Sequence, residues 1–190
     1  MPKFRVTRRR AWMLAVPACA VTAFQLLPTA PASAAGGCEY RSRLPAKASV
    51  ADLRSAVACL VNQRRRAHGL PALRPTSQLR RAATGHSKSM VRHDYFSHYS
   101  RRGSSFIDRI RRAGYLAGAG SWSLGEVIAT GSGWSATPRG VVHAWMHSAG
   151  HRTQILSSGF RDMGVGVAHG VPGAGARGAT YTIDFGSRVG

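Results

Sequence analysis

Three short segments of this chain carry the side chains best suited to chemistry. His98 ends the sequence FSH at 96–98, Glu126 lies in the apolar run LGEVIATG at 124–131, and His151 lies in AWMHSAGHRTQIL at 144–156. An imidazole can bind a metal ion or transfer a proton near neutral pH. A carboxylate in an apolar strand needs a partner, because burying it alone is costly. We therefore expect these three side chains to converge on one cleft.

The same three side chains could hold a divalent metal ion. Two neutral imidazoles, His98 and His151, can bind Zn²⁺ and leave positions open for water. Glu126 could accept a hydrogen bond from such a water or orient an imidazole, as carboxylates around metal sites do. Two protein ligands are fewer than the three of usual catalytic zinc sites, so the expected affinity is modest. The alternative is that Glu126 and the histidines only hydrogen-bond one another inside the cleft.

Two other motifs fail on their context. Gly173, Gly175 and Gly178 match the pattern G-x-G-x-x-G, but they lie in a loop that leads into a strand, which excludes a dinucleotide site. His143 and His147 have the spacing of two zinc ligands on a helix, but the carboxylate of the H-E-x-x-H motif is absent. We interpret both histidines as surface residues.

Hydrophobic periodicity predicts helices followed by strands around these residues. Helices are expected at 49–67, from a cap at Thr76 or Ser77 through Met90, from a cap at Ser104 or Ser105 through Arg112, and at 139–147 after a cap at Thr137; strands are expected at 123–130, 163–168 and 180–185. The second helix has a buried stripe at three-and-four spacing, formed by Leu79, Ala82, Ala83, His86 and Met90. The last two strands should form a long hairpin.

The first 34 residues predict a secretory signal peptide, which is excluded from the fold. A basic start precedes an apolar stretch at 11–27, and the sequence ASA at 32–34 fits a cleavage site. The apolar stretch contains Pro17 and falls short of the roughly 20 residues of a membrane-spanning helix. We therefore expect cleavage after Ala34, a secreted protein and no transmembrane span after processing.

The remaining chain suits a single domain with a real core. Residues 35–49 are expected to form an N-terminal linker, and residues 50–190 the domain, which we expect to be a monomer. Cys38 and Cys59 are the two cysteines left after cleavage. Outside the cytosol such a pair is usually a disulfide, and a loop of this size is worth about 3 kcal/mol. A metal site made by these two cysteines alone is not favoured, because no C-x-x-C spacing exists.

The charge of the processed chain indicates anionic surroundings. Without its signal peptide the chain has 22 basic and 7 acidic residues, a formal charge of +15 with histidine neutral. Lipid or anionic cell-envelope polymers are therefore possible partners. The arginines are scattered over predicted helices and their flanks, and we interpret them as a solvated surface. No basic motif interleaved with aromatic residues supports a specific nucleic-acid reader.

An ordered set of motifs resembles bacterial secreted CAP-domain proteins, which are relatives of cysteine-rich secretory proteins, antigen 5 and plant pathogenesis-related 1 proteins. The segments that carry the resemblance are LVNQRRRAHGLPAL (60–73), LRRAATGHSKSM (79–90), YFSH (95–98), DRIRRAGY (108–115), LGEVIATG (124–131), TPRGVVHAWMHSAGHRTQIL (137–156), FRDMGVGVAHG (160–170) and ATYTIDFG (179–186). They cover the chain from about Val50 to its end, in order and with compatible spacing.

The resemblance implies an α+β fold, a three-layer α-β-α sandwich with a central antiparallel sheet. It also implies a cleft with two histidines and two acidic residues. His98 and His151 match the histidines and Glu126 matches the first acid, while Ser148 stands where the second acid is usual. The cleft of this chain is thus expected to contain His98, Glu126, Ser148 and His151.

Three functions follow from these features. The first is a non-enzymatic binding module, extracellular or associated with the envelope, whose His/Glu/His cleft can bind a divalent metal; the resemblance implies sterol or lipid binding and roles at host or wall surfaces. The second is a metal-assisted hydrolase acting on peptide or cell-wall substrates. The third is an adhesive wall protein held by charge alone. The chain has no G-x-S-x-G motif and, with its cysteines paired, no free thiol, so we expect binding and assign no catalytic residue.

Overall fold

The computed structural model describes residues 38–190, apart from the side chain of Ala176; the predicted signal peptide and its cleavage site lie outside the described residues. The helices are α1 (Val50–Ala67), α2 (Ser77–Arg92), α3 (Phe106–Arg112), α4 (Pro138–Met146) and α5 (Ala149–Ile155), with short 3-10 helices η1 (Pro45–Lys47) and η2 (Gly133–Ala136); the strands are β1 (Arg74–Pro75), β2 (Ser121–Gly131), β3 (Asp162–Val171) and β4 (Gly175–Val189).

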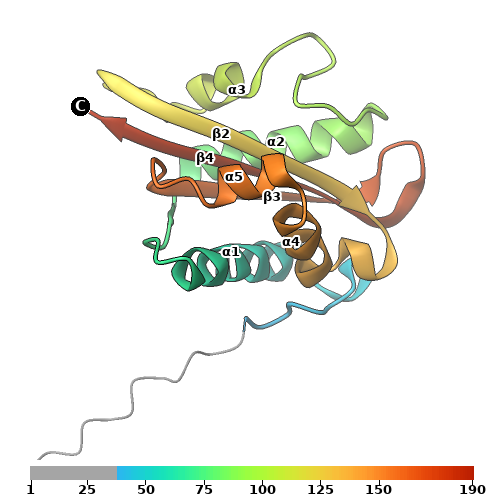
Figure 1. Cartoon of the computed structure of the whole chain (residues 1–190). Coiled ribbons are helices and arrows are strands. Elements are labelled where there is room, and N and C mark those ends of the chain that lie inside the picture. Colours follow the sequence, from blue (N-terminus) through green and yellow to red (C-terminus); the bar gives the residue numbers. More distant parts are fainter. Residues whose placement is uncertain (1–37) are drawn as a thin grey trace, which may run out of the picture. The chain divides into compact units, whose positions relative to one another are not determined.

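The strands form one sheet in the order β1-β3-β4-β2 (Figure 1). The hairpin β3–β4 is antiparallel, and β2 pairs antiparallel with the other edge of β4. The predicted antiparallel sheet is therefore confirmed for the three long strands. The two-residue strand β1 adds a short parallel pair with β3.

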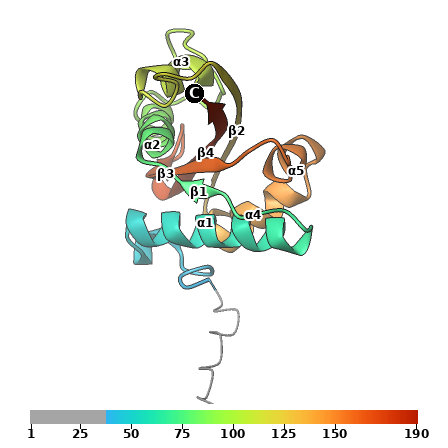
Figure 2. The same cartoon turned by 90° about the vertical axis from the view of Figure 1, so that its left-hand side faces the viewer.

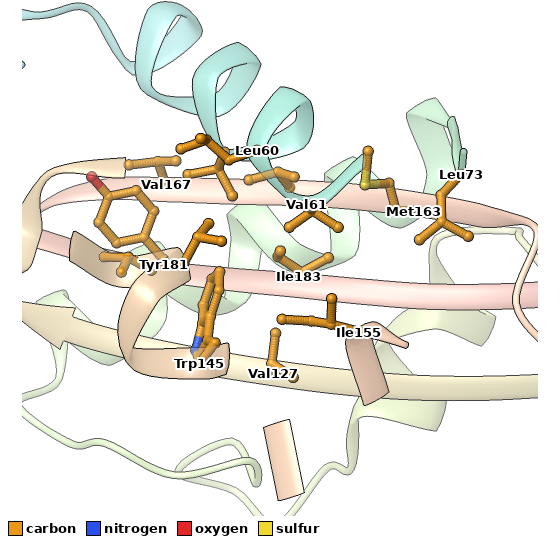
Figure 3. Packing of buried hydrophobic residues seen from close by; sticks show 14 of the residues in the cluster. Leu60, Val61, Leu73, Val127, Trp145, Ile155, Met163, Val167, Tyr181 and Ile183 are labelled. Carbon is orange, nitrogen blue, oxygen red and sulfur yellow. The ribbon is translucent and has the colours of Figure 1, made fainter. Parts of the chain in front are cut away.

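Helices cover both faces of this sheet. Figure 2 shows α2 and α3 on one side of the strands and α1 with α4 on the other. Strand residues alternate between the two faces, as the pleat requires. Tyr181, Ile183 and Phe185 of β4 belong to the main core with α1, α4 and Trp145 (Figure 3). The three-layer α-β-α sandwich is confirmed.

The interface between the sheet and α2 is unusually close and polar. A Cβ atom on Gly164 or Gly166 of β3 would overlap the backbone of α2 at Leu79 to Arg80 or at Ala83, so only glycine fits at these positions. The β4 residues on this face include Thr182 and Asp184, and Thr182 accepts a 2.9 Å hydrogen bond from Ser87 Oγ of α2. Polar side chains of β4 are therefore buried here, close to the backbone of α2.

The predicted helix starts are confirmed where a side chain caps the helix. Ser49 with Asp52 and Ser105 with Asp108 form complete capping boxes at α1 and α3, and Thr137 caps α4. The predicted strands are longer than expected at both ends. Helix α5 and strand β1 were not predicted: α5 is only seven residues long, and its N-cap Ser148 makes no capping hydrogen bond with its side chain.

One arginine of the run at 64–66 corrects the prediction of a solvated surface. Arg65 is fully buried. Its guanidinium donates hydrogen bonds to the carbonyl oxygens of Pro71 at 3.0 Å, Ile155 at 2.7 Å and Ser157 at 2.8 Å. The last turn of α1 is thus tied to the end of α5, and α5 carries His151.

The predicted disulfide is present. Cys38 and Cys59 are bonded, with Cα atoms 5.7 Å apart. Cys38 is buried within the main core cluster, and the backbone N–H of Arg139 at the start of α4 donates to the carbonyl of Arg41 at 2.8 Å. Residues 38–49, assigned from sequence to a linker, are therefore ordered against α1 and α4.

Candidate functional site

The centre of the candidate site is a carboxylate held by two bases. Glu126, in the middle of β2, has a side chain that is 1% exposed. Its Oε1 lies 2.8 Å from Nδ1 of His98, and its Oε2 accepts a 2.6 Å hydrogen bond from a terminal nitrogen of Arg109. His98 and Glu126 thus hydrogen-bond one another, as the alternative to a metal site expects. The side chain of His98 is 46% exposed, and its other nitrogen, Nε2, makes no hydrogen bond in the described residues.

Arg109 positions both halves of this pair. It lies in α3, is 8% exposed, and uses its other terminal nitrogen to donate to the carbonyl oxygens of His98 at 3.0 Å and Ser104 at 3.1 Å. One guanidinium therefore holds the Glu126 carboxylate and the loop that presents His98. Sequence reasoning missed Arg109, because it lies among other arginines and no motif separates it from its exposed neighbours.

The groups bonded to Glu126 offset the effect of burial on its pKa. Burial alone would raise the pKa of Glu126, but the hydrogen bond with His98 and the charge of Arg109 outweigh it and hold that pKa below its ordinary value. Glu126 is therefore an anion at neutral pH, and its negative charge lies directly behind His98.

A second histidine, on α2, supports the same loop through a hydrogen bond to its backbone. His86 of α2 is buried, and its Nε2 lies 2.9 Å from the carbonyl oxygen of Ser97. Since a carbonyl can only accept, Nε2 carries the proton of a neutral ring. Burial and then the positive charge of Arg109 lower the pKa of His86 to about 4. His86 is thus an uncharged support for residues 97–98, as its place in the predicted buried stripe of α2 allows.

A second carboxyl group lies next to Glu126. Asp184 of β4 is the direct cross-strand neighbour of Glu126, is fully buried, and neither of its oxygens has a hydrogen-bond partner within 38–190. Burial first, and then the charge of Glu126, raises the pKa of Asp184 well above its ordinary value. Asp184 was not predicted as a site residue. A single acid in the apolar run at 180–185 could have indicated it, because a carboxyl group buried in a strand is costly without a partner.

The remaining two predicted site residues lie on or next to α5. His151 is half-buried, and its pKa is lowered by burial and then by the charge of His98. Gln154 of the same helix lies against Gly125, the residue before Glu126, since a Cβ atom there would overlap Gln154 Oε1. Ser148 is half-buried at the N-cap, and in the described chain its side chain makes no hydrogen bond to the other three residues.

The donors available for a metal ion are few. In the part of the chain that the structure describes, no group of three or more His, Cys, Asp or Glu side chains is arranged to hold a metal ion. Both oxygens of Glu126 already accept hydrogen bonds. An ion at this site would therefore depend on the imidazoles of His98 and His151, which fits an open site of modest affinity and excludes a closed four-ligand site.

Aromatic side chains flank His98 in its loop. Phe96 is 49% exposed and Tyr99 is 61% exposed. Both aromatic rings are therefore accessible to a ligand beside His98. The sequence places them within three residues of His98, but their exposure could not be read from it.

Comparison with known proteins agrees with this architecture. The family model described as "Cysteine-rich secretory protein family" (CAP) matches residues 59–183. The uncharacterized protein YkwD of Bacillus subtilis (strain 168) is 36% identical over 121 residues, which is 64% of this chain and 44% of that protein. Within residues 38–190, no helix has the length and apolar character needed to cross a membrane.

Solved structures show the same fold. An extracellular protein containing an SCP domain from Bacillus anthracis str. Ames superposes with a TM-score of 0.57 at 29% identity, covering 73% of this chain and 43% of that one. An outer surface protein from Borrelia burgdorferi gives a TM-score of 0.61 at 16% identity, covering 75% of this chain and 97% of that one. The chain spans less than half the length of YkwD and of the Bacillus anthracis protein.

The family match extends over most of the described domain, and the sheet order, the three layers and the His98–Glu126 pair lie within it. This chain belongs to the CAP family of cysteine-rich secretory proteins.

Proposed function

We propose that this protein is a non-enzymatic binding module that acts outside the cytoplasm, with the imidazole of His98 as its main polar binding group. The observation that carries the proposal is the bond from His98 Nδ1 to Glu126, with Glu126 itself held by Arg109. A carboxylate behind an imidazole fixes the ring orientation and makes the far nitrogen a better ligand. Nε2 of His98, on a ring that is about half exposed, is that ligand.

A divalent ion such as Zn²⁺ is the simplest occupant. Neutral imidazole nitrogens of His98 and His151 would hold it, and Glu126 would stay behind His98 as an orienting group. The lowered pKa of His151 supports this role, because it favours the neutral ring, which is the form that binds a metal ion. When bound, the ion would supply open positions for a polar group of a ligand.

Binding is favoured over hydrolysis because the hydrogen bonds of the candidate catalytic groups, Glu126 and Ser148, are not those that catalysis needs. A general base must reach a proton on a substrate or a water, and both oxygens of Glu126 are already occupied by His98 and Arg109. A serine nucleophile needs a hydrogen-bonded base, and Ser148 has no such bond to His151 in the described residues. A metal-assisted hydrolase remains the alternative, since the free Nε2 of His98 could also move a proton.

A location at the cell envelope or beyond it is consistent with several features. One solved relative is described as extracellular and another as an outer surface protein. The chain contains a disulfide, which persists in oxidising surroundings. The formal charge of +15 expected after processing would hold the protein near anionic polymers or lipid headgroups.

Calorimetric titration with Zn²⁺ tests the binding site. His98→Ala and His151→Ala should abolish the binding heat, and Glu126→Gln should weaken it less, because Glu126 only orients a ligand. The matched control is His169→Ala, which removes an exposed histidine on β3. Ser148→Glu, which adds an acid beside α5, should strengthen binding.

Equal affinity in the wild type and in both site variants would refute the proposed site. The stacked rings of His143 and His147, with centroids 4.0 Å apart, would then be tested by the same titration. Release of product from peptide or cell-wall substrates by the wild type, lost in His98→Ala, would instead support the hydrolase.

A further inference from the structure

A wide groove with a strongly basic lining lies between α2, α3 and the loop that joins them. Its volume is about 850 Å³. It is formed by α2, by α3 and by the loop at 100–104 between them, and its lining residues are Arg81, Ala82, Gly85, His86, Ser89, His93, Ser100, Arg101, Arg102, Ser104, Arg109, Arg112 and Ala113. Five of these are arginines and none is acidic.

Several of these arginines are fixed in place by the fold. Arg81 donates to the carbonyl oxygen of Ala113 at 2.8 Å, and Arg112 donates through Nε to the carbonyl of Asp108 at 3.2 Å. Both contacts use a neutral acceptor, and neither arginine forms an ion pair in the described residues. Arg109 is ion-paired to Glu126 and its Nε is buried, so the exposed charge of the groove comes from the other four arginines.

Two more arginines of the lining, Arg101 and Arg102, are exposed and form no ion pair in the described chain. Asp108, the acid on α3, is engaged by the Ser105 cap and by Arg111, and it does not line the groove. A concave surface lined by charge of one sign concentrates the local potential, and here it attracts anions.

We propose that this groove binds the phosphate groups of a polyol-phosphate or sugar-phosphate chain. A guanidinium fork matches the geometry of a phosphate, and such charge-assisted bonds are among the strongest in proteins. The hydroxyl groups of Ser89, Ser100 and Ser104 lie in the same lining and suit the hydroxyl groups of the linking units. The groove shares Arg109 with the His98–Glu126 pair, but the proposed contacts do not use Nε2 of His98 and do not depend on a metal ion.

The residues that line the groove do not favour nucleic acids or phospholipids, the two other classes of partner that carry phosphate. No Phe, Tyr or Trp lines the groove, so nucleic acid bases would have no aromatic surface on which to stack. The apolar contribution comes from Ala82 and Ala113, which cannot cover an acyl chain. A lipid would therefore gain only its headgroup contacts here.

The test uses tripolyphosphate as the probe and compares two double variants of equal charge. Arg101→Ser/Arg102→Ser removes two charges from the groove, while Arg43→Ser/Arg66→Ser removes two exposed charges elsewhere and is the control. The groove variant should lose about tenfold in affinity, and the control less than about twofold. Amide resonances of Gly85, Ser89, Ser100 and Ser104 should shift on titration. Affinity for the probe should be the same with and without EDTA, which separates this proposal from the metal site.

Equal losses in the two double variants, or shifts scattered over the whole surface, would overturn the proposal in favour of general attraction by net charge. The partner class is tested with a glycerol-phosphate oligomer, a thymidine oligonucleotide of the same charge and vesicles of phosphatidylglycerol. The glycerol-phosphate chain should bind most tightly and should lose affinity in the groove variant. If the oligonucleotide or the vesicles bind more tightly and lose affinity in the groove variant, nucleic acid or lipid would replace the polyol-phosphate chain as the proposed partner.

Discussion

Asp184 lies directly opposite Glu126 in the β2–β4 pair, so two carboxyl groups share one buried face of the sheet. Glu126 has two hydrogen-bonded partners that hold its pKa low, whereas Asp184 has none within 38–190 and its pKa is raised by burial and by the charge of Glu126. Two neighbouring carboxylates cannot both be charged in a dry interior without a large cost. The difference in their partners decides which of them carries the charge.

Asp184→Asn should stabilise the protein at neutral pH. The raised pKa of Asp184 means that the folded state keeps a proton that the unfolded state releases above about pH 4, so stability is lost as the pH rises past that value. An amide of the same shape does not titrate. Thermal unfolding should show a midpoint about 3 °C higher in the variant at pH 7 and no gain at pH 3. A lower midpoint at pH 7 would mean that Asp184 is ionised when folded.

Arg109→Leu should lower the stability of the fold far more than replacement of an exposed arginine on the same helix. It would leave the Glu126 carboxylate buried with one partner and release the loop carbonyls of His98 and Ser104. Removing one side of a buried ion pair costs about 3–5 kcal/mol. Chemical denaturation measures the loss, and Arg111→Leu, an exposed residue on the same helix, is the control. Equal losses in the two variants would show that Arg109 acts only through helix packing.

His86 should make the protein sensitive to acid. Its folded pKa of about 4 lies below the ordinary value of 6.5, so the unfolded state binds the extra proton between these values and stability falls as the pH drops through that window. Charged and titratable neighbours in the same layer are Arg109, Glu126 and His98. Relative to His86→Gln, the wild-type unfolding midpoint should drop by about 5 °C between pH 6.5 and pH 4. Parallel curves for the two proteins would contradict this role.

Gly166→Ala tests the close contact between β3 and α2. The added methyl group would overlap the backbone of Ala83, which cannot move aside as a flexible side chain could. The expected cost is about 3 kcal/mol. Gly85→Ala, in the exposed part of α2 with no atom near the new methyl group, should gain up to about 1 kcal/mol from helix propensity. Equal stability of the two variants in chemical denaturation would show that α2 can shift away from the sheet.

Removing the disulfide should weaken the whole domain. Cys38 and Cys59 enclose a loop with a sequence separation of 21 residues. The chain-entropy estimate is about 3 kcal/mol, or a fall of roughly 10 °C in the unfolding midpoint. The double variant Cys38→Ser/Cys59→Ser measures this under non-reducing conditions. A wild-type midpoint unchanged by reductant would show that the bond contributes little.

The individual helices and strands could be predicted because each leaves a local pattern, whereas their arrangement in three layers came from the resemblance of the ordered motifs. The apolar stripe of α2, the caps at Ser105 and Thr137, and the alternating strands at 163–168 and 180–185 are properties of neighbouring residues. Helix α5 leaves no such pattern, because it has seven residues and no side-chain cap. It is held by a distant residue, Arg65.

The candidate site was predicted only in part for the same reason. His98 and Glu126 were recognised from their residue types and from the ordered motifs around them. Arg109 and Asp184 depend on which arginine turns inward and on the strand register of Glu126, and no short pattern records either. Arg65 was assigned to the solvated surface, although its guanidinium is buried against three carbonyl oxygens.

Arg65 also has a consequence for how the chain folds. Its partners Ile155 and Ser157 lie 90 and 92 residues further along the sequence. Pro71 supplies only one of the three acceptors, so the buried guanidinium is fully bonded only when the end of α5 lies against α1. Contacts between residues so far apart in the sequence slow the folding of a domain. We therefore expect the packing of the last turn of α1 to depend on the docking of α5, the helix that carries His151.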